Sequence, residues 1–510
     1  MRRYFKPLFS KKILTVLFVL LQIALLVMPV LRVYSNYMYL GFLMNIVAAG
    51  LVVFEINRES DAGFKLIWIA IIAFFPVFGT FLYVYVQSDM IMRLFKKRVN
   101  DLNAESLRIA DGMGLTENYI AETLPDEAGI LRYLRSQASA PCFEIENIEY
   151  FPLGEDMYSR LIRDVSKAEK YVFLEFFIVN EFDSMWSELL KILCQKAEDG
   201  VEIRMIYDAM GSLTTTKANL DERLRKMGIN CYQFSPVKPF ISTYHNNRDH
   251  RKIVVIDGEI AYTGGVNLAD EYVNRKVRFG HWKDTAIRVE GDSVKRFLAM
   301  YLKIWRLVCP HEDSEVYRNK AESYYQGKDG YIVPFDDTPV DTKYITRDVY
   351  LHILSSAKDY VYINTPYLIL DDALLQAMKF AAARGVKVKI CMPHIPDKWY
   401  AFMLARSYYP ELLRAGVEIY EYKQGFLHAK STVSDGRRGY VGSANYDYRS
   451  LYLHYECGAY LCESSVIETI KDDFEKTIEA GINFTIDKYS ELNWFYRVSG
   501  RVLRLFSSVM

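Results

Sequence analysis

The sequence predicts a duplicated α/β fold, two units of mixed sheets flanked by helices, preceded by an N-terminal helical membrane anchor. Three observations lead to this fold class. Long apolar stretches without charge fill much of the chain before residue 90, short apolar runs alternate with amphipathic segments after about residue 150, and the second half repeats the motifs of the first. A chain of 510 residues is also too long for one ordinary core.

The anchor is predicted from three stretches that contain no charged residue, at 13–31, 33–54 and 66–86. Each is about as long as the roughly 20 helical residues that cross a bilayer. A cleaved signal peptide explains the first stretch poorly, because it has no small-x-small cleavage site and a second apolar stretch follows one Arg later. Residues 1–98 are therefore expected to form a multi-pass membrane region with two or three transmembrane helices.

Basic residues lie at both ends of this region, five in MRRYFKPLFSKK and four in RLFKKR at 93–98. The positive-inside tendency would place both ends in the cytoplasm, which three complete spans cannot do. One stretch is therefore expected to be re-entrant or interfacial, and Pro76 and Gly79 make the third stretch the candidate. The rest of the chain is expected at the cytoplasmic face.

The duplication is visible as matched segments. SKAEKYVFLEFFIV at 166–179 corresponds to SSAKDYVYINTPYL at 355–368, and EDGVEIRMIYD at 198–208 corresponds to ARGVKVKICMP at 383–393. A repeat of this length indicates duplicated domains, because solenoid repeats run to about 20–50 residues.

The domain boundaries follow from these matches. The first unit is predicted at 135–310 and the second at 331–510, with linkers at 99–134 and 311–330. A pseudo-dyad between the units would bring equivalent strands together at a shared interface.

The same chemical motif occurs once in each unit, as HRKIVVIDG from residue 250 and HAKSTVSD from residue 428. Alternate residues of a strand share a face, so His250 and Lys252 are predicted to point one way, as are His428 and Lys430. One His-x-Lys alone would usually be an ordinary surface feature. Two copies at equivalent positions predict one cleft with two imidazoles and two ammonium groups.

Such a cleft suits a phosphodiester. The lysines can neutralise nonbridging oxygens while one imidazole attacks phosphorus and the other protonates the leaving alcohol. The two imidazoles are expected to titrate as a coupled pair, with one neutral and one protonated at the start of the cycle.

Glycine-rich segments, GGVN and GSAN, follow both motifs at the same spacing. Asn267 and Asn445 can donate amide hydrogens to phosphate oxygens. The residues before them are expected to let the backbone approach the ligand closely. These residues are Gly264, Gly265, Gly442 and Ser443.

Four carboxylates complete the candidate site. Asp284 in HWKDTAIRV and Glu456 in LHYECGAYL lie on the next apolar strand of each half, and they are candidates to fix the second nitrogen of the histidines. Asp257 and Asp435 end the two motifs and are counted with the catalytic set. Each also begins a turn, DGEI or DGRR, so a structural role is at least as well supported.

Composition argues against some classes of partner and of bound metal. The 63 basic and 63 acidic residues balance, which removes the bulk electrostatic argument for a nucleic-acid partner. The seven cysteines are scattered and lack metal-ligand spacing, so neither a disulfide framework nor a zinc site is predicted.

The doubled H-x-K-x-x-x-x-D element with its trailing GGVN and GSAN resembles the phospholipase D superfamily. DHRKIVVIDGEIAYTGGVNLADEY, HWKDTAIRVEG and INTPYLILDDAL are similar to bacterial cardiolipin synthases. The resemblance covers the chain from about residue 135 to its end, and the apolar N-terminus resembles the membrane segment of that family. It implies a pair of phospholipase D-like domains in an enzyme that is anchored in the bacterial cytoplasmic membrane.

The resemblance also implies a reaction without metal or other cofactor. A histidine takes a phosphatidyl group from one phosphatidylglycerol and releases glycerol, and a second phosphatidylglycerol accepts the group to give cardiolipin. The first-half histidine is usually the nucleophile in the superfamily, which here is His250, with His428 as acid and then base. Position 265 is Gly where many members have Ser, so the first half lacks a hydroxyl that Ser443 retains.

Other functions stay open at this point. A phospholipase D-type hydrolase, or a phosphatidyltransferase with another donor or alcohol acceptor, would use the same residues, because water competes with the acceptor. A nuclease is disfavoured by the zero net charge and the anchor. An inactive lipid-binding module would be expected to have lost a motif histidine or lysine, and this chain keeps all four.

Overall fold

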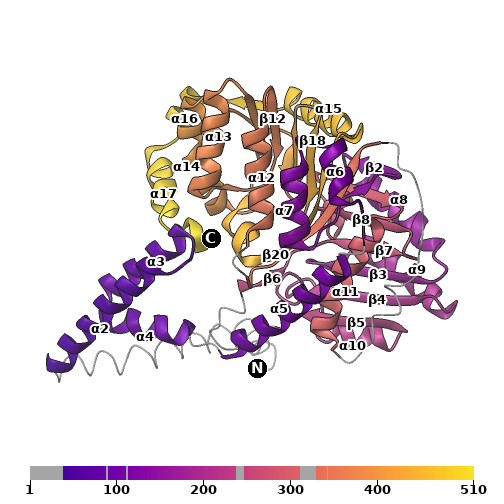
Figure 1. The fold of residues 1–510 in the computed structure, drawn as a ribbon, viewed down its shortest axis with the longest axis horizontal. Helices are drawn as coiled ribbons and strands as arrows, with labels where there is room; N and C mark the ends of the chain where they lie inside the picture. The colour runs from indigo at the N-terminus through magenta and orange to yellow at the C-terminus, as the bar shows by residue number, and fades with distance from the viewer. Residues whose placement is uncertain are drawn as a thin grey trace, which may run out of the picture.

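The fold is taken from a computed structural model, which describes residues 38–87, 90–110, 113–236, 246–310, 329–341 and 343–509. The apolar stretch at 13–31 and nearly all of the linker predicted at 311–330 lie outside these residues. Two α/β halves lie side by side, and three N-terminal helices project from the second half (Figure 1).

The first half is built on a seven-stranded mixed sheet. Its central strands are nearly continuous apolar runs buried on both faces, as expected for a sheet covered by helices on each side. In spatial order the strands are β2 (Asn147–Phe151), β10 (Ala286–Glu290), β8 (Ile260–Gly264), β7 (Ile253–Ile256), β3 (Tyr171–Phe176), β4 (Glu202–Asp208) and β5 (Ile229–Phe234).

The second half repeats this sheet with the same order of equivalent strands. They are β11 (Tyr331–Asp337), β20 (His454–Cys462), β18 (Arg438–Gly442), β17 (Ser431–Ser434), β12 (Tyr360–Asn364), β14 (Lys387–Pro393) and β15 (Glu418–Tyr422). Further strands extend it, namely β1 (Phe143–Glu144) and β21 (Ile482–Phe484) at the two edges and β6 (Arg248–Asp249) beside β20. The predicted pair of mixed α/β units is thus confirmed.

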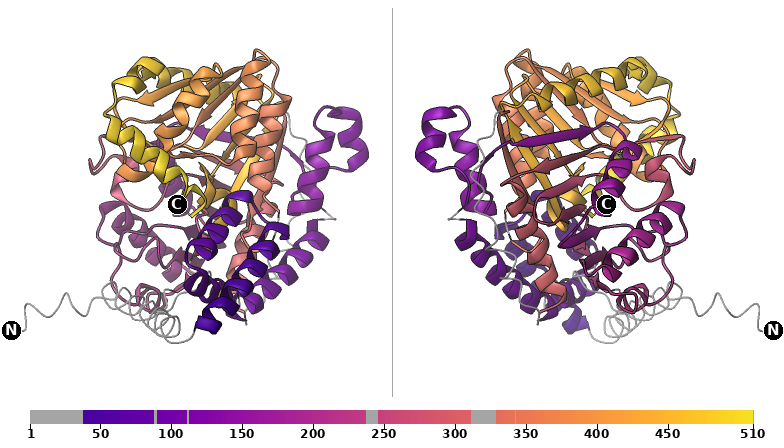
Figure 2. Two further views of the ribbon diagram at one scale, coloured as in Figure 1. Left: turned by 90° about the vertical axis from the view of Figure 1, so that its left-hand side faces the viewer. Right: turned by 90° about the vertical axis from the view of Figure 1, so that its right-hand side faces the viewer.

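Helices form three layers around the two sheets (Figure 2). The outer layer of the first half contains α8 (Gly154–Ser166), α9 (Ser184–Glu198) and α10 (Leu220–Arg225). The outer layer of the second half contains α12 (Ile345–Ser356), α13 (Asp372–Ala383) and α14 (Trp399–Arg414), with α16 (Ile486–Glu491) and α17 (Trp494–Arg504) beside α14. Between the sheets lie the equivalent helices α11 (Val294–Val308) and α15 (Val466–Glu479), whose apolar side chains join both halves in one core.

The segment predicted as a linker at 99–134 is instead helical. It contains the end of α5 (Met90–Ala110), α6 (Glu117–Thr123) and most of α7 (Ala128–Ala138). Ile120, Leu131 and Leu134 are buried in the core of the second half, and β1 pairs with β11. The predicted start of the first unit at 135 is therefore too early, because residues up to 144 pack on the second half and the first-half sheet begins with β2.

The N-terminal helices are α2 (Met38–Asn57), α3 (Ala62–Phe74) and α4 (Pro76–Gln87), and all three pack on one another. The predicted stretch at 66–86 is broken at Pro76, which begins α4 as prolines commonly begin helices. Gly79 allows close packing of α4 on α3, because a Cβ there would lie 2.6 Å from the carbonyl oxygen of Ile71. Within the described residues, none of the helices has both the length and the apolar character required to traverse a bilayer.

Candidate active site

Two short parallel ladders cross from one half to the other and fix the two motifs. β6 immediately precedes His250 and pairs with the start of β20, and the His250 amide donates to the Tyr455 carbonyl at 2.9 Å. β16 (Gly425–Leu427) immediately precedes His428 and pairs with β9 (His281–Lys283), and the His428 amide donates to the Lys283 carbonyl at 2.7 Å. Each histidine is therefore attached to the opposite half.

This arrangement corrects the expectation that the motif residues lie within strands. His250 and Lys252 occupy the connection between β6 and β7, and His428 and Lys430 occupy the one between β16 and β17. The backbone at each histidine bonds to the other half and leaves its own sheet. The side chain of each lysine still bonds to the histidine of its own motif. Lys252 Nζ donates to the His250 carbonyl at 2.5 Å, and Lys430 Nζ donates to the His428 carbonyl.

Each imidazole is held by a carboxylate from the opposite half. His250 Nδ1 lies 2.9 Å from Glu456 Oε1, and His428 Nδ1 lies 2.6 Å from Asp284 Oδ2. The ionised carboxylates can only accept, so we assign the proton to Nδ1 in both rings. Each Nε2 then keeps a lone pair for chemistry.

The two carboxylates have different supports. Ser443 Oγ donates to Glu456 Oε2 at 2.5 Å. At the equivalent position Gly265 makes room for its carboxylate, because a Cβ there would lie 2.0 Å from Asp284 Oδ1. Asp284 instead accepts from the backbone amide of Thr285 at 2.9 Å.

Gly264 and Gly442 allow adjacent strands to pack closely. A Cβ at Gly264 would lie 2.4 Å from the Thr285 carbonyl oxygen, and one at Gly442 would lie 2.5 Å from that of Cys457. Gly265 and Ser443 serve the two carboxylates. The close approach of this backbone to a substrate stays a prediction.

Asn267 and Asn445 are both buried near the motifs, but among the described residues a different side-chain atom of each lacks a hydrogen-bond partner. Asn267 Oδ1 accepts from the Ile178 amide at 3.0 Å, and its Nδ2 has no hydrogen-bond partner among the described residues. Asn445 Nδ2 donates to Asp447 Oδ2 at 3.0 Å, and in the described chain its Oδ1 is the atom without a partner. Of the two, Asn267 therefore keeps its side-chain NH2 available to donate to a phosphate oxygen.

Asp257 and Asp435 do not belong to the catalytic set. The Asp257 carboxylate accepts three backbone amides, from Glu169, Lys170 and Tyr171, at 2.7–2.8 Å. The Asp435 carboxylate does the same with the amides of residues 358–360, at 2.8–3.0 Å. Both aspartates have positive φ in the turn that follows the motif strand, so they join that turn to the strand beside it.

Burial controls the protonation of the site. His250 and His428 are only 7% and 6% exposed, and the lysines are buried as well. Burial lowers the pKa of His250 well below its ordinary value, and burial together with Lys430 lowers the pKa of His428 to about 4 despite Asp284. Burial lowers the pKa of Lys252 to about 8 and that of Lys430 to about 7.

Desolvation and two nearby lysines oppose a positive charge on either ring, so both imidazoles are neutral at pH 7 in this structure. The expected pair of one neutral and one protonated ring at the start of the cycle stays a prediction, because it concerns the site with a phosphodiester bound. Burial also works against ionisation of Glu456, but His250 and His454 together outweigh it and hold the pKa of Glu456 well below its usual range. A neutral imidazole hydrogen-bonded to a carboxylate results.

Several site residues were missed from the sequence. His454 lies beside His250 with ring centroids 5.5 Å apart, and Phe177 contacts the same ring edge-on at 4.9 Å. Trp282 and Tyr272 pack on His428 at 5.3 and 5.4 Å. The signal for His454 and Trp282 was present, because each stands two residues before an orienting carboxylate.

His250, His454 and Glu456 are also the one group among the described residues whose geometry could hold a metal ion, with ligand atoms within 4.8 Å of one another. A cation there would displace the hydrogen bond between His250 and Glu456. We assign no metal to this group, because that bond already serves the imidazole.

Another buried residue, Arg251, ties the first motif to the second half. Its Nε donates to Glu175 Oε1 at 2.8 Å, and its Nη1 lies 3.6 Å from Asp336 Oδ2 on β11. Asp336 in turn accepts from Arg296 at 2.6 Å. Truncating one member would leave a buried charge unpaired, so the network holds the first motif in a fixed position.

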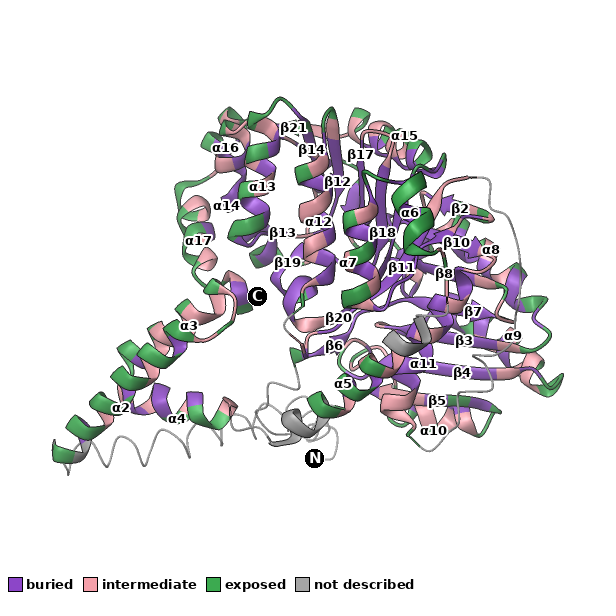
Figure 3. Ribbon diagram, viewed as in Figure 1, coloured by how far each residue is buried: buried purple, intermediate pink, exposed green. Residues whose placement is uncertain are grey.

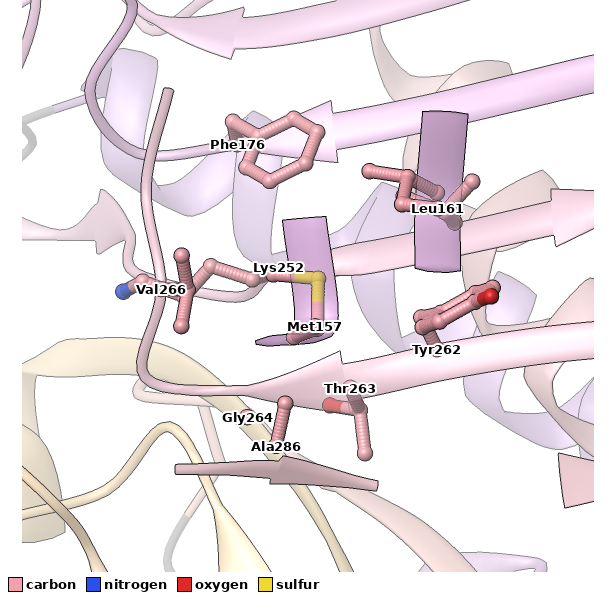
Figure 4. Close-up of a pocket in the computed structure, with 10 residues that line it drawn as sticks. Met157, Leu161, Phe176, Lys252, Tyr262, Thr263, Gly264, Val266 and Ala286 are labelled. Atoms are coloured by element: carbon pink, nitrogen blue, oxygen red, sulfur yellow. The ribbon is translucent and has the colours of Figure 1, made fainter. Parts of the chain in front are cut away.

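A small cavity lies beneath the first motif within the first half (Figure 4). Its volume is about 10 Å³, enough for one water molecule at most. Apart from Lys252 its lining is mostly apolar: Met157, Leu161, Phe176, Val254, Tyr262, Thr263, Gly264, Val266 and Ala286. It contains neither histidine, so it is a gap in the core and not the substrate site.

Comparison with known proteins agrees with this geometry. The family described as "Cardiolipin synthase, PLD-like domain" matches residues 161–280 and 350–478, and the family described as "Phospholipase_D-nuclease N-terminal" matches residues 43–86. The two matches of the first family contain the two motifs.

Full-length relatives are also similar. An uncharacterised protein of Streptococcus mutans is 39% identical over 90% of this chain and 100% of its own length. A cardiolipin synthase of Alkalihalophilus pseudofirmus is 31% identical over 92% of this chain and 93% of its own. Among solved structures, a phosphatidylserine synthase of Haemophilus influenzae has the same fold, with a TM-score of 0.56 at 14% identity over 74% of this chain and 97% of that one. The chain therefore belongs to the family of bacterial cardiolipin synthases with paired phospholipase D-like domains.

Proposed function

We propose that the protein is a cardiolipin synthase, a phosphatidyltransferase that joins two phosphatidylglycerol molecules into cardiolipin and releases glycerol. One observation carries the proposal: two buried neutral imidazoles, each fixed by a carboxylate of the opposite half and each beside a buried lysine. Stepwise phosphatidyl transfer requires a nucleophile and an acid on opposite sides of the phosphodiester.

In the first step His250 Nε2 attacks the phosphorus of one phosphatidylglycerol. The bond from phosphorus to the glycerol oxygen breaks as the N–P bond forms, and His428 gives a proton to that oxygen so that neutral glycerol leaves. Lys252 and Lys430 neutralise the nonbridging oxygens, and the Asn267 amide can donate to them. The bound anion raises the pKa of His428, so that its Nε2 takes up a proton from solvent as the lipid binds, and this is the proton that goes to the glycerol oxygen.

In the second step His428 takes the proton from a glycerol hydroxyl of another phosphatidylglycerol. The resulting oxygen attacks phosphorus, the N–P bond breaks, and His250 regains its neutral state with its proton on Nδ1. The cycle balances without an external oxidant or reductant.

The support of the two carboxylates favours His250 as the nucleophile. Glu456 accepts from both Ser443 and His250, which keeps it in place as positive charge develops on the imidazole. His428 must exchange a proton with successive alcohols, and it faces the lone carboxylate Asp284 and the aromatic rings of Trp282 and Tyr272.

Transfer over hydrolysis is supported by the low exposure of both histidines. Water competes for the phosphohistidine, and low exposure of the histidines to solvent reduces that competition. A hydrolase would give phosphatidic acid from the same intermediate, so the product distinguishes the two reactions.

We further propose that the N-terminal helices attach the protein to the bacterial cytoplasmic membrane, with the two-domain part at the cytoplasmic face. Much of these helices is exposed (Figure 3). Their exposed side chains are mostly large and apolar, among them Tyr39, Phe42, Leu43, Ile46, Phe54, Leu66, Phe74, Phe75 and Val84. Contiguous apolar surface of this kind marks contact with a membrane or a partner. The same helices meet the second half, because Asp61, just before α3, lies 3.4 Å from the Tyr452 hydroxyl.

The test is incubation of the purified full-length protein with labelled phosphatidylglycerol in mixed micelles, without divalent metal, while lipid and water-soluble products are followed. Cardiolipin with an equal amount of glycerol is the expected result, lost in both His250→Ala and His428→Ala. Phosphatidic acid as the sole lipid product would overturn the proposal in favour of hydrolysis. His352→Ala is the matched control, since His352 lies on α12 and pairs with Glu127 on the outer side of the second half.

A further inference from the structure

The C-terminal helix α17 carries an apolar stripe that no part of the described chain covers. At 100° per residue, its exposed apolar positions fall within an arc of about 100°. The stripe consists of Trp494, Phe495, Val498 and Val502, and it continues past the helix end with Leu505 and Phe506. Trp494 is 68% exposed and Leu505 72%.

The opposite face of α17 packs on the second half and holds the helix in place. It packs on α14 so closely that a Cβ at Gly500 would lie 2.7 Å from the Met403 carbonyl oxygen. Arg504 lies over the Tyr408 ring at 4.1 Å and donates to Glu411 at 3.2 Å. The helix is therefore anchored from one side, and the outward stripe contributes nothing to that contact.

Charge and aromatic content indicate what covers the stripe. Arg497 and Arg501 lie along one edge of it, with Arg501 exposed. A helix with an aromatic and aliphatic face bordered by arginines is typical of segments that lie in the head-group region of anionic bilayers. The aromatic pair Trp494 and Phe495 is of the kind that collects at that interface.

The position of the stripe supports the same occupant. The last turn, η5 (Ser507–Val509), contacts α3, where a Cβ at Gly63 would lie 3.0 Å from Ser508 Cβ. The end of the stripe thus lies next to the N-terminal helices, as the adjacent yellow and indigo helices in Figure 2 show.

The stripe is also linked to the site. Exposed Trp399 begins α14, and its neighbour Lys398 lies 5.1 Å from the ring of Tyr367. Tyr367 precedes β13 (Leu368–Ile369), which pairs with β19 (Tyr446–Asp447) directly after Asn445. A chain of contacts therefore leads from the start of α14, the helix on which α17 packs, to the segment beside Asn445.

We propose that α17 and the residues after it lie in the interface of an anionic bilayer as a second membrane contact, separate from the N-terminal helices. The contact would hold the second half against the surface that contains the substrate. This inference rests on the membrane attachment in the proposed function, but not on which lipid is the substrate.

The first test attaches an environment-sensitive fluorophore to a cysteine introduced by Val498→Cys in the full-length protein. Vesicles of phosphatidylglycerol and phosphatidylcholine are expected to shift its emission to the blue, and lipids brominated on their acyl chains are expected to quench it. Pure phosphatidylcholine vesicles should give a weaker response because of the arginines. The control is Val277→Cys, which places the fluorophore at an exposed apolar position of the first half. No response at position 498 would overturn the proposal.

A second test separates this contact from catalysis. The double variant Phe495→Ser, Val498→Ser is expected to lose about tenfold in activity on phosphatidylglycerol vesicles, through a higher apparent KM for lipid surface. Its activity on a monomeric short-chain phosphatidylglycerol should stay within twofold of that of the parent. Equal loss on both substrates would overturn the proposal, as would efficient disulfide formation between Val498→Cys chains, which would show that a second copy covers the stripe. If the parent makes no cardiolipin from either lipid, the proposed function fails while the fluorescence test still decides this one.

Discussion

The two half-sites share one frame and differ in the residues that fill it. In each half a short strand leads into the histidine, pairs with the opposite half, and places the imidazole on a carboxylate from that half. The frame is symmetric because the two sheets have the same strand order. Duplication alone would therefore give two equal histidines.

The differences lie in four pairs of equivalent positions. Glu456 with its Ser443 support corresponds to Asp284 with Gly265. In addition, His454 stands where the other half has Trp282, and Arg251 stands where it has Ala429. A symmetric fold thus supports two chemical roles through a few side chains.

The largest expected effect comes from replacing the two histidines one at a time. His250→Ala and His428→Ala should each lose at least about 10³-fold on phosphatidylglycerol. With a phosphatidyl-p-nitrophenol substrate, whose leaving group needs no proton, His428→Ala should still release a burst of p-nitrophenol while His250→Ala should not. A burst from His250→Ala and none from His428→Ala would reverse the assigned roles.

Next come the orienting carboxylates. Glu456→Gln and Asp284→Asn should each reduce turnover of phosphatidylglycerol by about 10²-fold, because the imidazoles lose their fixed tautomer. On the p-nitrophenyl substrate the burst should slow in Glu456→Gln and remain in Asp284→Asn. Equal effects of the two variants on the burst would contradict separate roles for the half-sites.

The lysines predict the pH dependence. The pKa values of Lys430 at about 7 and Lys252 at about 8 mean that each lysine is charged below its pKa and loses the charge above it. Because the charge binds phosphate, kcat/KM should fall as pH rises through 7 and fall more steeply above 8. Lys430→Arg stays protonated and should flatten the first part of the decline. A kcat/KM that is constant from pH 7 to 9 in the parent would contradict this.

A smaller effect is expected when the second-half support is made to resemble the first. Ser443→Gly removes one hydrogen bond to Glu456, worth about 1 kcal/mol, so activity should drop about fivefold. The reverse change, Gly265→Ser, should cost more, because its Cβ would lie 2.0 Å from Asp284 Oδ1 and displace the carboxylate. Steady-state turnover of the two variants measures the difference, and a milder effect of Gly265→Ser would show that the first half tolerates the same support.

The smallest effect on turnover is expected from Asp257→Asn. It weakens a carboxylate that accepts three backbone amides away from the site, so the apparent Tm should fall by a few degrees while kcat of the folded enzyme stays within about twofold. Glu259→Gln, at an exposed ion pair with Lys170, is the matched control for stability. A large loss of kcat in Asp257→Asn would return this residue to the catalytic set.

Sequence by itself determined the duplicated α/β units, the two His-x-Lys pairs and the candidate carboxylates Asp284 and Glu456. These features are local, since a strand is marked by its apolar run and a motif by its spacing. Sequence also pointed to Pro76 as an interruption of the third apolar stretch, and α4 begins there.

The tertiary structure alone decided how these parts are combined. It paired each histidine with the carboxylate of the opposite half and placed Asp257 and Asp435 in turns. It also showed that the expected linker forms packed helices. It also brought His454 beside His250 and buried the site enough to keep both rings neutral. Spacing along a chain cannot report these facts, because contacts between partners 144 and 206 residues apart and the loss of solvent both arise only when the two halves close on each other.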